Sequence, residues 1–356
     1  MVSHFVLLRR IHFKVWDALS SSANWATSMK SHNNLIGQIT SKENMLLAFE
    51  RTASAKRMTY GYLEFKEYKS LNLDALAKEL KEGTYKIGAY KQFYVYEPKQ
   101  RLISALEFKD RLAQHALVAV IDNIFEAMFL PNTYACRVGK GTHAGVRYIQ
   151  SELRKAPIPT YYLKTDYSKF FPSVDHTLLL AMIERKIGCA RTLDIIKQLI
   201  IPGNVGIPIG SLTSQLFANI YGSKLDNFIH HKLKNRRWAR YMDDVVILGN
   251  DPEKLRDDFI KIKEFSQDNL NLSISKWECA SVNRGINFLG YRVWSIHKLI
   301  RKDSALRAKQ KIKRFIEYNE TENLTKFLAS WRGHAGWADT HNLFNWLDNK
   351  YDYANH

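Results

Sequence analysis

Cysteine is scarce in this chain of 356 residues, which holds only Cys136, Cys189 and Cys279. Three widely separated cysteines form neither a disulfide framework, which needs an even number, nor a zinc site, which needs closely spaced ligands. The sequence therefore excludes a disulfide-stabilised secreted domain. We expect the protein to work in a reducing compartment, the cytoplasm.

Long apolar runs are also absent. None approaches the ~18 residues that a membrane-spanning helix requires, so we expect no membrane partner. Residues 1–13 hold a short apolar patch, but Arg9 and Arg10 lie behind it and no small-residue cleavage site follows. This pattern is not that of a secretory signal peptide.

A glycine-rich phosphate loop is missing as well. The glycines in residues 139–145 are too few and wrongly spaced for the G-x-x-x-x-G-K-[ST] pattern. Without that loop the backbone cannot wrap a triphosphate in the way that a P-loop enzyme requires. Nucleotide hydrolysis of that class is therefore excluded.

Basic residues are what the chain has in excess. Lys and Arg number 53 against 35 Asp and Glu, which gives a net charge of +18, and 46% hydrophobic residues predict a folded core. A folded, strongly basic protein most often binds a polyanion such as nucleic acid. The composition also fits a membrane-surface protein, but no long basic amphipathic helix supports that alternative.

Two adjacent acids, Asp243 and Asp244, follow Tyr241 and Met242 and precede the apolar run Val245–Leu248. Neighbouring residues of a straight strand point to opposite faces, so the two carboxylates share a site only if the chain turns there. We therefore predict a β-hairpin with the acids at its tip. Such carboxylates suit Mg²⁺, although an Asp-rich turn is often purely structural.

A third acid, Asp166, ends a predicted strand at 161–166, and Asp175 is expected to be the N-cap of the next helix rather than a metal ligand. If this strand and the hairpin share one sheet, Asp166, Asp243 and Asp244 converge. Two divalent cations ~3.5–4 Å apart then clamp the attacking and leaving oxygens of a phosphoryl transfer. This order of elements indicates the chemistry of a nucleic-acid polymerase.

Other segments supply candidate contacts for nucleotides and nucleic acid. Residues 85–106 are typical of a hairpin with a basic tip, which either grips a triphosphate or is simply solvated. Residues 206–215 form a Gly/Pro loop that either lets the backbone approach a nucleotide or is a plain turn. Short strands are predicted at 270–276, ending in Lys276, and at 286–291.

From Asp303 onward the chain is predicted to be helical. A basic face of Arg307, Lys311 and Arg314 is expected to lie along a nucleic-acid backbone. The side chains expected behind that face or in the core of a small bundle are Leu306, Ile312, Phe315, Ile316, Trp331, Trp337, Leu343, Phe344, Trp346 and Leu347.

Together these motifs resemble those of reverse transcriptases. Tyr241–Asp244 is similar to the family's Tyr-x-Asp-Asp motif and Lys164–Phe171 to its first catalytic motif, while Lys276 and Phe288-Leu289-Gly290 fit its later motifs. Group II intron and retroviral enzymes usually carry Pro-Gln-Gly in the loop. This chain has Ile207-Pro208-Ile209-Gly210, followed by Ser214-Gln215.

That loop resembles the reverse transcriptases of diversity-generating retroelements, phage-borne members in particular. So do Leu216–Asn219, Arg101–Arg111 and Gly333–Thr340, and the resemblance covers about residues 30–356. It implies an α+β right-hand polymerase fold with fingers, an antiparallel-sheet palm and a small helical thumb. The expected parts are an N-terminal and fingers region at 29–160, a palm at 161–300 with part of the fingers at 176–235, and a thumb at 301–356. Residues 1–28 lie outside the resemblance and are expected to be either a disordered N-terminal extension or a segment before a true start at Met29.

By motif position, the resemblance assigns two Mg²⁺ ions, with Mn²⁺ as a substitute, to Asp166, Asp243 and Asp244, with the Tyr167 carbonyl as an extra ligand. Lys276 is the implied general acid for the pyrophosphate leaving group or, alternatively, only a solvated strand end. The implied dNTP-binding set is Lys99, Arg101, Phe171, Ile209 and Gly210, in which Phe171 excludes a 2′-hydroxyl or, alternatively, only packs in the core. Tyr241 and Met242 join Arg307, Lys311 and Arg314 as nucleic-acid contacts.

The implied function is error-prone synthesis of adenine-mutagenised cDNA from a template-repeat RNA, for targeted protein diversification. Ile209 stands where the family usually has Gln, and it cannot make that side chain's hydrogen bonds. Loss of one polar contact weakens discrimination between correct and incorrect nucleotides by ~1–3 kcal/mol. Ile209, with Arg101, is therefore the expected source of low fidelity.

The implied partners are template-repeat RNA, the RNA/cDNA hybrid, dNTPs and a small basic, oligomeric accessory variability protein. The expected location is the cytoplasm of a bacterial host, with a phage or chromosomal gene. The alternatives are a retron, group II intron-like or antiphage-defence reverse transcriptase, and a non-catalytic RNA-binding scaffold. Intron enzymes usually add DNA-binding and endonuclease modules, and we find no Cys/His cluster after the thumb.

Overall fold

The computed structural model describes residues 31–351 except residues 55, 97–99 and 201–202. The extension predicted at 1–28 lies outside these residues, as does Lys99. The chain divides into two compact units. One comprises residues up to Phe129 with Phe171–Tyr221 and Phe265–Leu272; the other comprises Leu130–Phe170, Gly222–Glu264 and the residues from Ser273.

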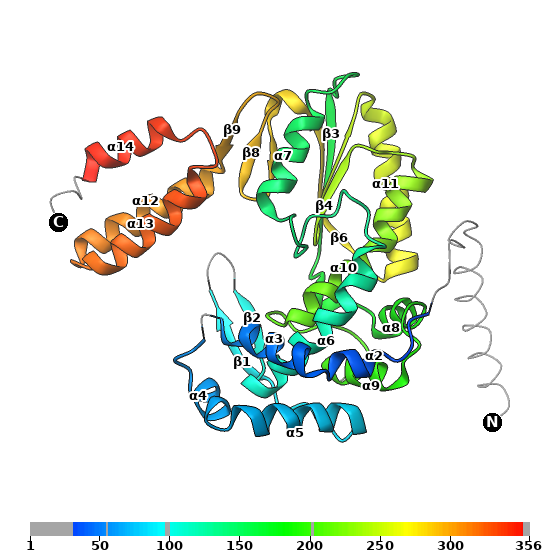
Figure 1. Cartoon of the computed structure of the whole chain (residues 1–356). Helices are drawn as coiled ribbons and strands as arrows, with labels where there is room; N and C mark the ends of the chain where they lie inside the picture. Colours follow the sequence, from blue (N-terminus) through cyan, green and yellow to red (C-terminus); the bar gives the residue numbers. More distant parts are fainter. Residues whose placement is uncertain (1–30, 55, 97–99, 201–202, 352–356) are drawn as a thin grey trace. The chain divides into compact units, whose positions relative to one another are not determined.

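The first unit is mainly helical (Figure 1). Its elements are α2 (Leu35–Ile39), α3 (Lys42–Ala53), α4 (Tyr60–Glu67), α5 (Lys69–Glu82), β1 (Lys91–Val95), β2 (Arg101–Ala105), α6 (Phe108–Glu126), the 3₁₀ turn η1 (Phe171–Ser173), α8 (His176–Glu184), α9 (Ala190–Leu199), the first part of α10 (Leu212–Asn227) and the end of α11 (Pro252–Leu270). Local signals in the sequence set several helix ends. The Ser41 side chain accepts a hydrogen bond from the Asn44 amide at 3.2 Å, and Gly83 ends α5 with φ 78°.

Asp175 caps α8, as its position before an apolar periodicity predicts. Its Oδ1 accepts a hydrogen bond from the Leu178 amide at 2.9 Å, and its Oδ2 accepts one from Asn271 at 3.0 Å. Both carboxylate oxygens therefore have structural partners. The expectation that Asp175 is an N-cap is confirmed.

The second unit is built on a four-stranded antiparallel sheet. Its elements are α7 (Thr142–Glu152), β3 (Tyr161–Tyr167), the last part of α10, the π-helical turn η2 (Phe228–Lys232), β4 (Trp238–Tyr241), β5 (Asp244–Gly249), most of α11 (Pro252–Leu270), β6 (Ile274–Ser281), the 3₁₀ turn η3 (Val282–Arg284), β7 (Ile286–Phe288), β8 (Tyr291–Val293), β9 (Lys298–Ile300), α12 (Lys302–Glu317), α13 (Thr321–Ala335) and α14 (His341–Tyr351). The large sheet has the strand order β4-β5-β3-β6, and β7, β8 and β9 form a separate antiparallel sheet.

Side chains cover both faces of the large sheet, which explains the unbroken apolar run of β5. On one face, α7 and strands β7 and β8 share a buried cluster with β3, β4 and β5, which includes Ile149, Val246 and Phe288. Figure 1 shows α7 and β8 beside this sheet. On α11, the Phe259 ring stacks at 4.2 Å on Trp277 of β6. All four residues of Val245–Leu248 are buried as a result.

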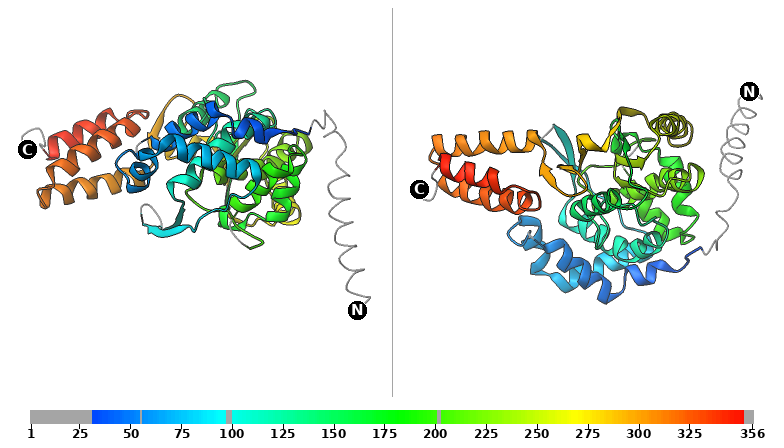
Figure 2. Two further views of the ribbon diagram at one scale, coloured as in Figure 1. Left: turned by 60° about the horizontal axis from the view of Figure 1, so that its bottom comes forward. Right: turned by 90° about the horizontal axis from the view of Figure 1, so that it is seen from above.

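Helices α12, α13 and α14 form a small bundle with its own core, and they lie side by side in Figures 1 and 2. Ile312, Phe315, Trp331 and Leu347 are buried in that core, as predicted. Leu306 was expected there but is exposed, because its position on α12 lies outside the stripe formed by Ala308, Ile312 and Phe315. The expectation for Trp337 and Trp346 is also wrong: each remains about two-fifths exposed.

Two strand predictions are corrected. The strand expected at 270–276 begins only at Ile274 and continues to Ser281, because α11 extends to Leu270. Lys276 therefore lies inside β6 rather than at its end. The single strand expected at 286–291 is two strands, β7 and β8, joined by a turn at Leu289 and Gly290, which both have positive φ.

The combination of helices and antiparallel sheets confirms the α+β class. Within the described ranges, no helix has both the length and the apolar character needed to cross a bilayer.

Candidate functional site

The hairpin that carries the two adjacent acids forms as the sequence predicts. Tyr241 of β4 pairs with Asp244 of β5, so Met242 and Asp243 make a two-residue connection. Met242 has φ 53°, and a positive φ at the first connecting residue is the requirement of a type II′ turn. The turn places Asp243 at the tip, and Asp244 is the first residue of the outgoing strand.

Strand pairing brings the third acid beside this hairpin. Asp166 of β3 lies directly opposite Asp244 of β5 and, on its other side, opposite Lys276 of β6. The pairing of β3 with β6 shifts register just after Asp166, and the Ser275 hydroxyl donates to the Asp166 carbonyl at 3.0 Å. Three adjacent strands thus present Asp244, Asp166 and Lys276 in one row. Tyr167, a candidate through its carbonyl, follows the register shift.

Lys164 balances part of the negative charge in this row. Its Nζ donates to Oδ2 of Asp244 at 3.1 Å and to the Asn287 carbonyl at 2.6 Å. Burial, opposed by Lys164 and aided by the charges of Asp243 and Asp166, raises the pKa of Asp244 to about 6. Asp244 is therefore close enough to both other acids to be repelled by their charges.

The donor set fits a divalent cation, although its convergence on one ion stays a prediction. In the described part of the chain, no three His, Cys, Asp or Glu side chains are grouped closely enough to hold a metal. However, Oδ1 of Asp244 is buried and accepts no hydrogen bond, while Lys164 reaches it only as an ion pair at 3.1 Å. A carboxylate oxygen that accepts no hydrogen bond, beside a second carboxylate, suits Mg²⁺ or Mn²⁺.

Four predicted nucleotide-binding residues occur together in the first unit. The Ile209 carbonyl accepts a hydrogen bond from the Ser104 amide of β2 at 2.9 Å, which fastens the loop to the strand that begins with exposed Arg101. The Ile207 amide donates to the Phe171 carbonyl at 3.0 Å. Gly210 has φ 102°, and an added Cβ would lie 2.8 Å from Ile103, so only glycine fits here.

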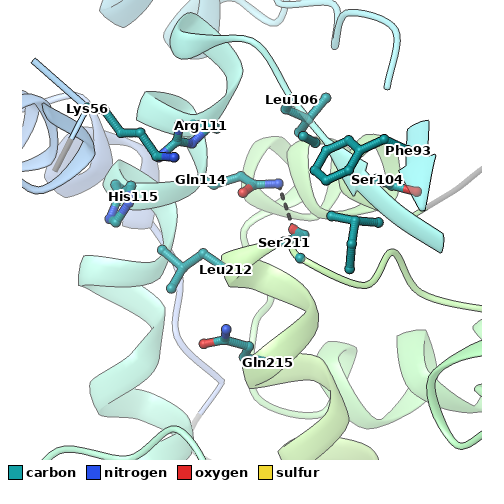
Figure 3. Close-up of a pocket in the computed structure, with 13 residues that line it drawn as sticks. Lys56, Phe93, Ser104, Leu106, Arg111, Gln114, His115, Ser211, Leu212 and Gln215 are labelled. Carbon is teal, nitrogen blue, oxygen red and sulfur yellow. Dashed lines mark hydrogen bonds between the residues drawn. The ribbon is translucent and has the colours of Figure 1, made fainter. Parts of the chain in front are cut away.

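A cavity of about 330 Å³ opens beside this loop in the same unit (Figure 3). Its lining includes Lys56, Arg111, Gln114 and His115 but no carboxylate. Burial lowers the pKa of His115 to about 4, helped by the charge of Arg111, so this imidazole is neutral at pH 7. The Gln114 amide donates to Ser211 at 2.8 Å across the cavity wall. Sequence reasoning did not find this cavity, because its residues come from four separate elements.

The predicted nucleic-acid contacts lie in the second unit. Tyr241 is partly buried and Met242 is buried at the hairpin. On α12, Arg307 and Arg314 are exposed, whereas Lys311 lies 5.4 Å above the ring of Phe327. Arg314 also lies 5.1 Å above the ring of Phe315, so two of the three cations of the predicted basic face stack on aromatic rings of the bundle.

Two features of the site escaped the sequence reasoning. Lys164 was recoverable, because it precedes Asp166 by two residues and alternate residues of a strand share a face. The second feature is an ion pair between Arg240 and Asp226, both fully buried. No local pattern reveals that pair, because one partner lies on a helix and the other on a strand.

Comparison with known proteins shows which family this chain is similar to. Residues 90–293 match the family described as "Reverse transcriptase (RNA-dependent DNA polymerase)". Protein YkfC of Escherichia coli (strain K12) is 25% identical over 284 residues, covering 66% of this chain and 73% of YkfC.

Two other relatives carry intron names. The Group II intron-encoded protein LtrA of Lactococcus lactis subsp. cremoris is 26% identical over 167 residues, covering 43% of this chain and 27% of LtrA. Nuclear intron maturase 3, mitochondrial, of Arabidopsis thaliana is 20% identical over 326 residues, covering 79% of this chain and 44% of the maturase. The matched part therefore spans under half of these two longer proteins.

If Asp166, Asp243 and Asp244 bind a divalent cation, that cation should stabilise the folded protein, and the stabilisation should depend on Asp243. Mg²⁺ at ten times its Kd is expected to add about 1.4 kcal/mol to the free energy of unfolding. Asp243→Asn keeps a residue suited to turns but removes a ligand and a repulsive charge. We expect this variant to gain less from Mg²⁺, and to be no less stable than wild type in EDTA. Chemical denaturation with and without Mg²⁺ measures both effects.

Asp175→Asn is the matched control, because Asn caps helices as well as Asp does. It should retain the full Mg²⁺ stabilisation. An equal gain in wild type and Asp243→Asn would contradict the assignment.

Proposed function

Because the chain belongs to the reverse transcriptase family of RNA-dependent DNA polymerases, we propose that the row of Asp244, Asp166 and Lys276 is its centre for RNA-templated DNA synthesis. The observation that carries this proposal is the pairing of Asp166 with Asp244, directly beside the turn that holds Asp243. The proposed architecture is a right hand, in which the sheet β4-β5-β3-β6 is the palm and the bundle α12–α14 is the thumb.

In this proposal, Asp166, Asp243 and Asp244 hold two Mg²⁺ ions, with the Tyr167 carbonyl as a further ligand. When bound, such a pair of ions supplies electrostatic stabilisation to the attacking and leaving oxygens of an in-line phosphoryl transfer. Lys164 limits repulsion among the acids through its contact with Asp244. Lys276, exposed on β6 beside Asp166, donates a proton to the pyrophosphate leaving group.

The nucleotide-binding part of the proposal rests on the first unit. Arg101, with Lys99, neutralises the triphosphate of the dNTP, while Phe171 and the loop at Ile209 and Gly210 contact its sugar and base. The contacts of Ile209 with Ser104, and of Ile207 with Phe171, support this grouping. The cavity beside Gly210, with Lys56 and Arg111 and no acid in its lining, offers phosphate groups a favourable potential.

Primer extension tests the catalytic proposal. The wild-type protein, an RNA template, a DNA primer, dNTPs and Mg²⁺ should give a DNA product. Replacing both hairpin acids, Asp243→Ala with Asp244→Ala, should lower the rate by at least ~10³-fold, because several kcal/mol of charge stabilisation in the transition state is lost. Binding of the RNA template should change little, since phosphate contacts on other elements remain.

The absence of a metal-dependent product from folded wild-type protein would contradict the proposal. It would leave the second candidate, an RNA-binding scaffold, as the better account of the basic charge.

The finer proposal is a reverse transcriptase of a diversity-generating retroelement, which makes adenine-mutagenised cDNA from a template-repeat RNA. It is supported by Ile209 in place of the usual Gln and by Ser214-Gln215 after it. The proposed partner is a small basic accessory variability protein, and co-purification from the native host tests that association.

Group II intron-type function is the second candidate, favoured by the names of the relatives LtrA and Nuclear intron maturase 3. The DNA beside the gene separates the two. A near-duplicate repeat pair that differs at adenines favours the retroelement, and intron RNA boundaries favour the other.

Ile209 gives the retroelement proposal a direct biochemical test. Ile209→Gln restores an amide that hydrogen-bonds near the nascent base pair, and a gain of ~1–3 kcal/mol in discrimination corresponds to a ~5- to 150-fold lower error rate. We expect the reduction mainly opposite template adenines, measured by sequencing cDNA made in vitro. Ile209→Leu, which adds no polar group, is the matched control. An unchanged error rate at adenines in Ile209→Gln would contradict the role of Ile209.

A further inference from the structure

A fully buried ion pair lies behind the acidic hairpin. Arg240 of β4 donates from Nε to Oδ1 of Asp226 at 2.6 Å and from Nη2 to Oδ2 at 2.7 Å. Asp226, on α10, also accepts a hydrogen bond from the Thr133 hydroxyl at 2.9 Å. Both charged side chains are completely shielded from solvent. Because desolvation offsets much of the attraction in such a pair, stability alone does not explain it.

The remaining arm of Arg240 reaches the turn itself. Nη1 donates to the Met242 carbonyl at 3.2 Å. That carbonyl belongs to the peptide that joins Met242 to Asp243. The contact therefore fixes the orientation of this peptide plane, which immediately precedes the Asp243 side chain. Met242 is held at φ 53°, a conformation that side chains disfavour. The guanidinium thus helps to hold a strained turn in place.

The backbone of Arg240 is fixed as well. Its amide donates to the Asn132 carbonyl at 3.0 Å, and its carbonyl accepts from the Tyr134 amide at 2.9 Å. On the other side, Arg240 pairs with Val245 in the ladder between β4 and β5. The backbone that carries the guanidinium is therefore held on both sides, and the hydrogen bond from Nη1 to the Met242 carbonyl restrains the turn.

Gly222 makes room for this arrangement. It lies four residues before Asp226 on α10, and a Cβ built there would lie 2.6 Å from both Cζ and Nη1 of Arg240. Glycine inside a helix is less favourable than alanine. The guanidinium packs against the helix backbone only because this position has no side chain.

We propose that Arg240, Asp226 and Gly222 are positioning residues for the metal-binding carboxylates, and this inference rests on the proposed function of the hairpin. Gly222 admits the guanidinium, Asp226 orients it, and Arg240 fixes the Met242–Asp243 peptide. The turn that carries Asp243 and leads into Asp244 is thereby held in one conformation. In this proposal all three act through the turn and not on the cations directly.

Gly222→Ala tests the inference while leaving both charges in place. It favours the helix intrinsically, but its methyl group displaces the Arg240 guanidinium. Misplacement of a catalytic group by ~1 Å lowers rates by up to ~10²-fold. We expect kcat for primer extension to fall at least ~10-fold, with KM for dNTP within ~2-fold of wild type. Mn²⁺ binding, followed by electron paramagnetic resonance without nucleic acid, should weaken at least ~5-fold by the same misplacement.

Gly37→Ala on α2, where an added Cβ meets nothing within 4 Å, is the control and should match wild type in all three measurements. A rescue variant separates positioning from general stability. Glycine adopts a positive φ freely and is preferred at the first position of a type II′ turn. Adding Met242→Gly should therefore make the Gly222→Ala change at least ~3-fold less harmful to kcat than it is in the wild-type background.

Wild-type kcat and Mn²⁺ affinity in Gly222→Ala would overturn the inference, as would the same loss in both backgrounds. If circular dichroism shows that Gly222→Ala does not fold, Thr133→Val replaces it. This variant removes one hydrogen bond to Asp226 and adds no bulk, and it should weaken Mn²⁺ binding in the same direction. If wild type makes no DNA, the proposed function fails, but the Mn²⁺ comparison still decides whether these residues position the carboxylates.

Discussion

The pairing register of β5, β3 and β6 is the constraint on which the site depends. It sets Asp166 between Asp244 and Lys276 on three adjacent strands. A slip of one residue would turn every side chain of β3 to the opposite face. Burial prevents that slip, because Leu163 of β3 and Val245–Leu248 of β5 are enclosed by the core. The position of the acids is therefore a consequence of apolar packing.

The hairpin adds a second constraint, since two acids adjacent in the sequence must serve one site. A turn between Tyr241 and Asp244 solves the geometric problem, but it places Met242 in a disfavoured conformation and leaves like charges close together. Lys164 offsets part of the repulsion through Asp244, while Arg240 holds the turn from behind. Lys164 and Arg240 thus have separate structural tasks, apart from the general attraction of a basic protein for nucleic acid.

Much of this fold was predictable because its signals are local. The cap at Asp175, the helix end at Gly83 and the hairpin of Asp243 and Asp244 each follow from a few neighbouring residues. The errors occur where long-range packing decides. Leu306 was expected behind the basic face of α12, but the neighbouring helices cover only the side that carries Ala308, Ile312 and Phe315.

The same reason limits what the sequence reveals about the site. Lys276 was predicted at the end of its strand, but α11 delays the start of β6 and moves that lysine inside it. The Arg240–Asp226 pair and the space beside Gly222 exist only once α10 packs against β4. A glycine in a helix and an arginine in a strand carry no local signal of their contact.

The central claim is that divalent cations bind at the edge formed by Asp166 and the Asp243–Asp244 turn. Iron-mediated cleavage tests it most directly, because Fe²⁺ in place of Mg²⁺ reduces added hydrogen peroxide to hydroxyl radicals, which cut the backbone close to the ion, and ascorbate regenerates the Fe²⁺. We expect cuts in the intact chain near Asp166 and near Asp243 and Asp244, and we expect excess Mg²⁺ to suppress them. Cuts confined to other segments, or cuts at these acids that Mg²⁺ does not suppress, would contradict the account.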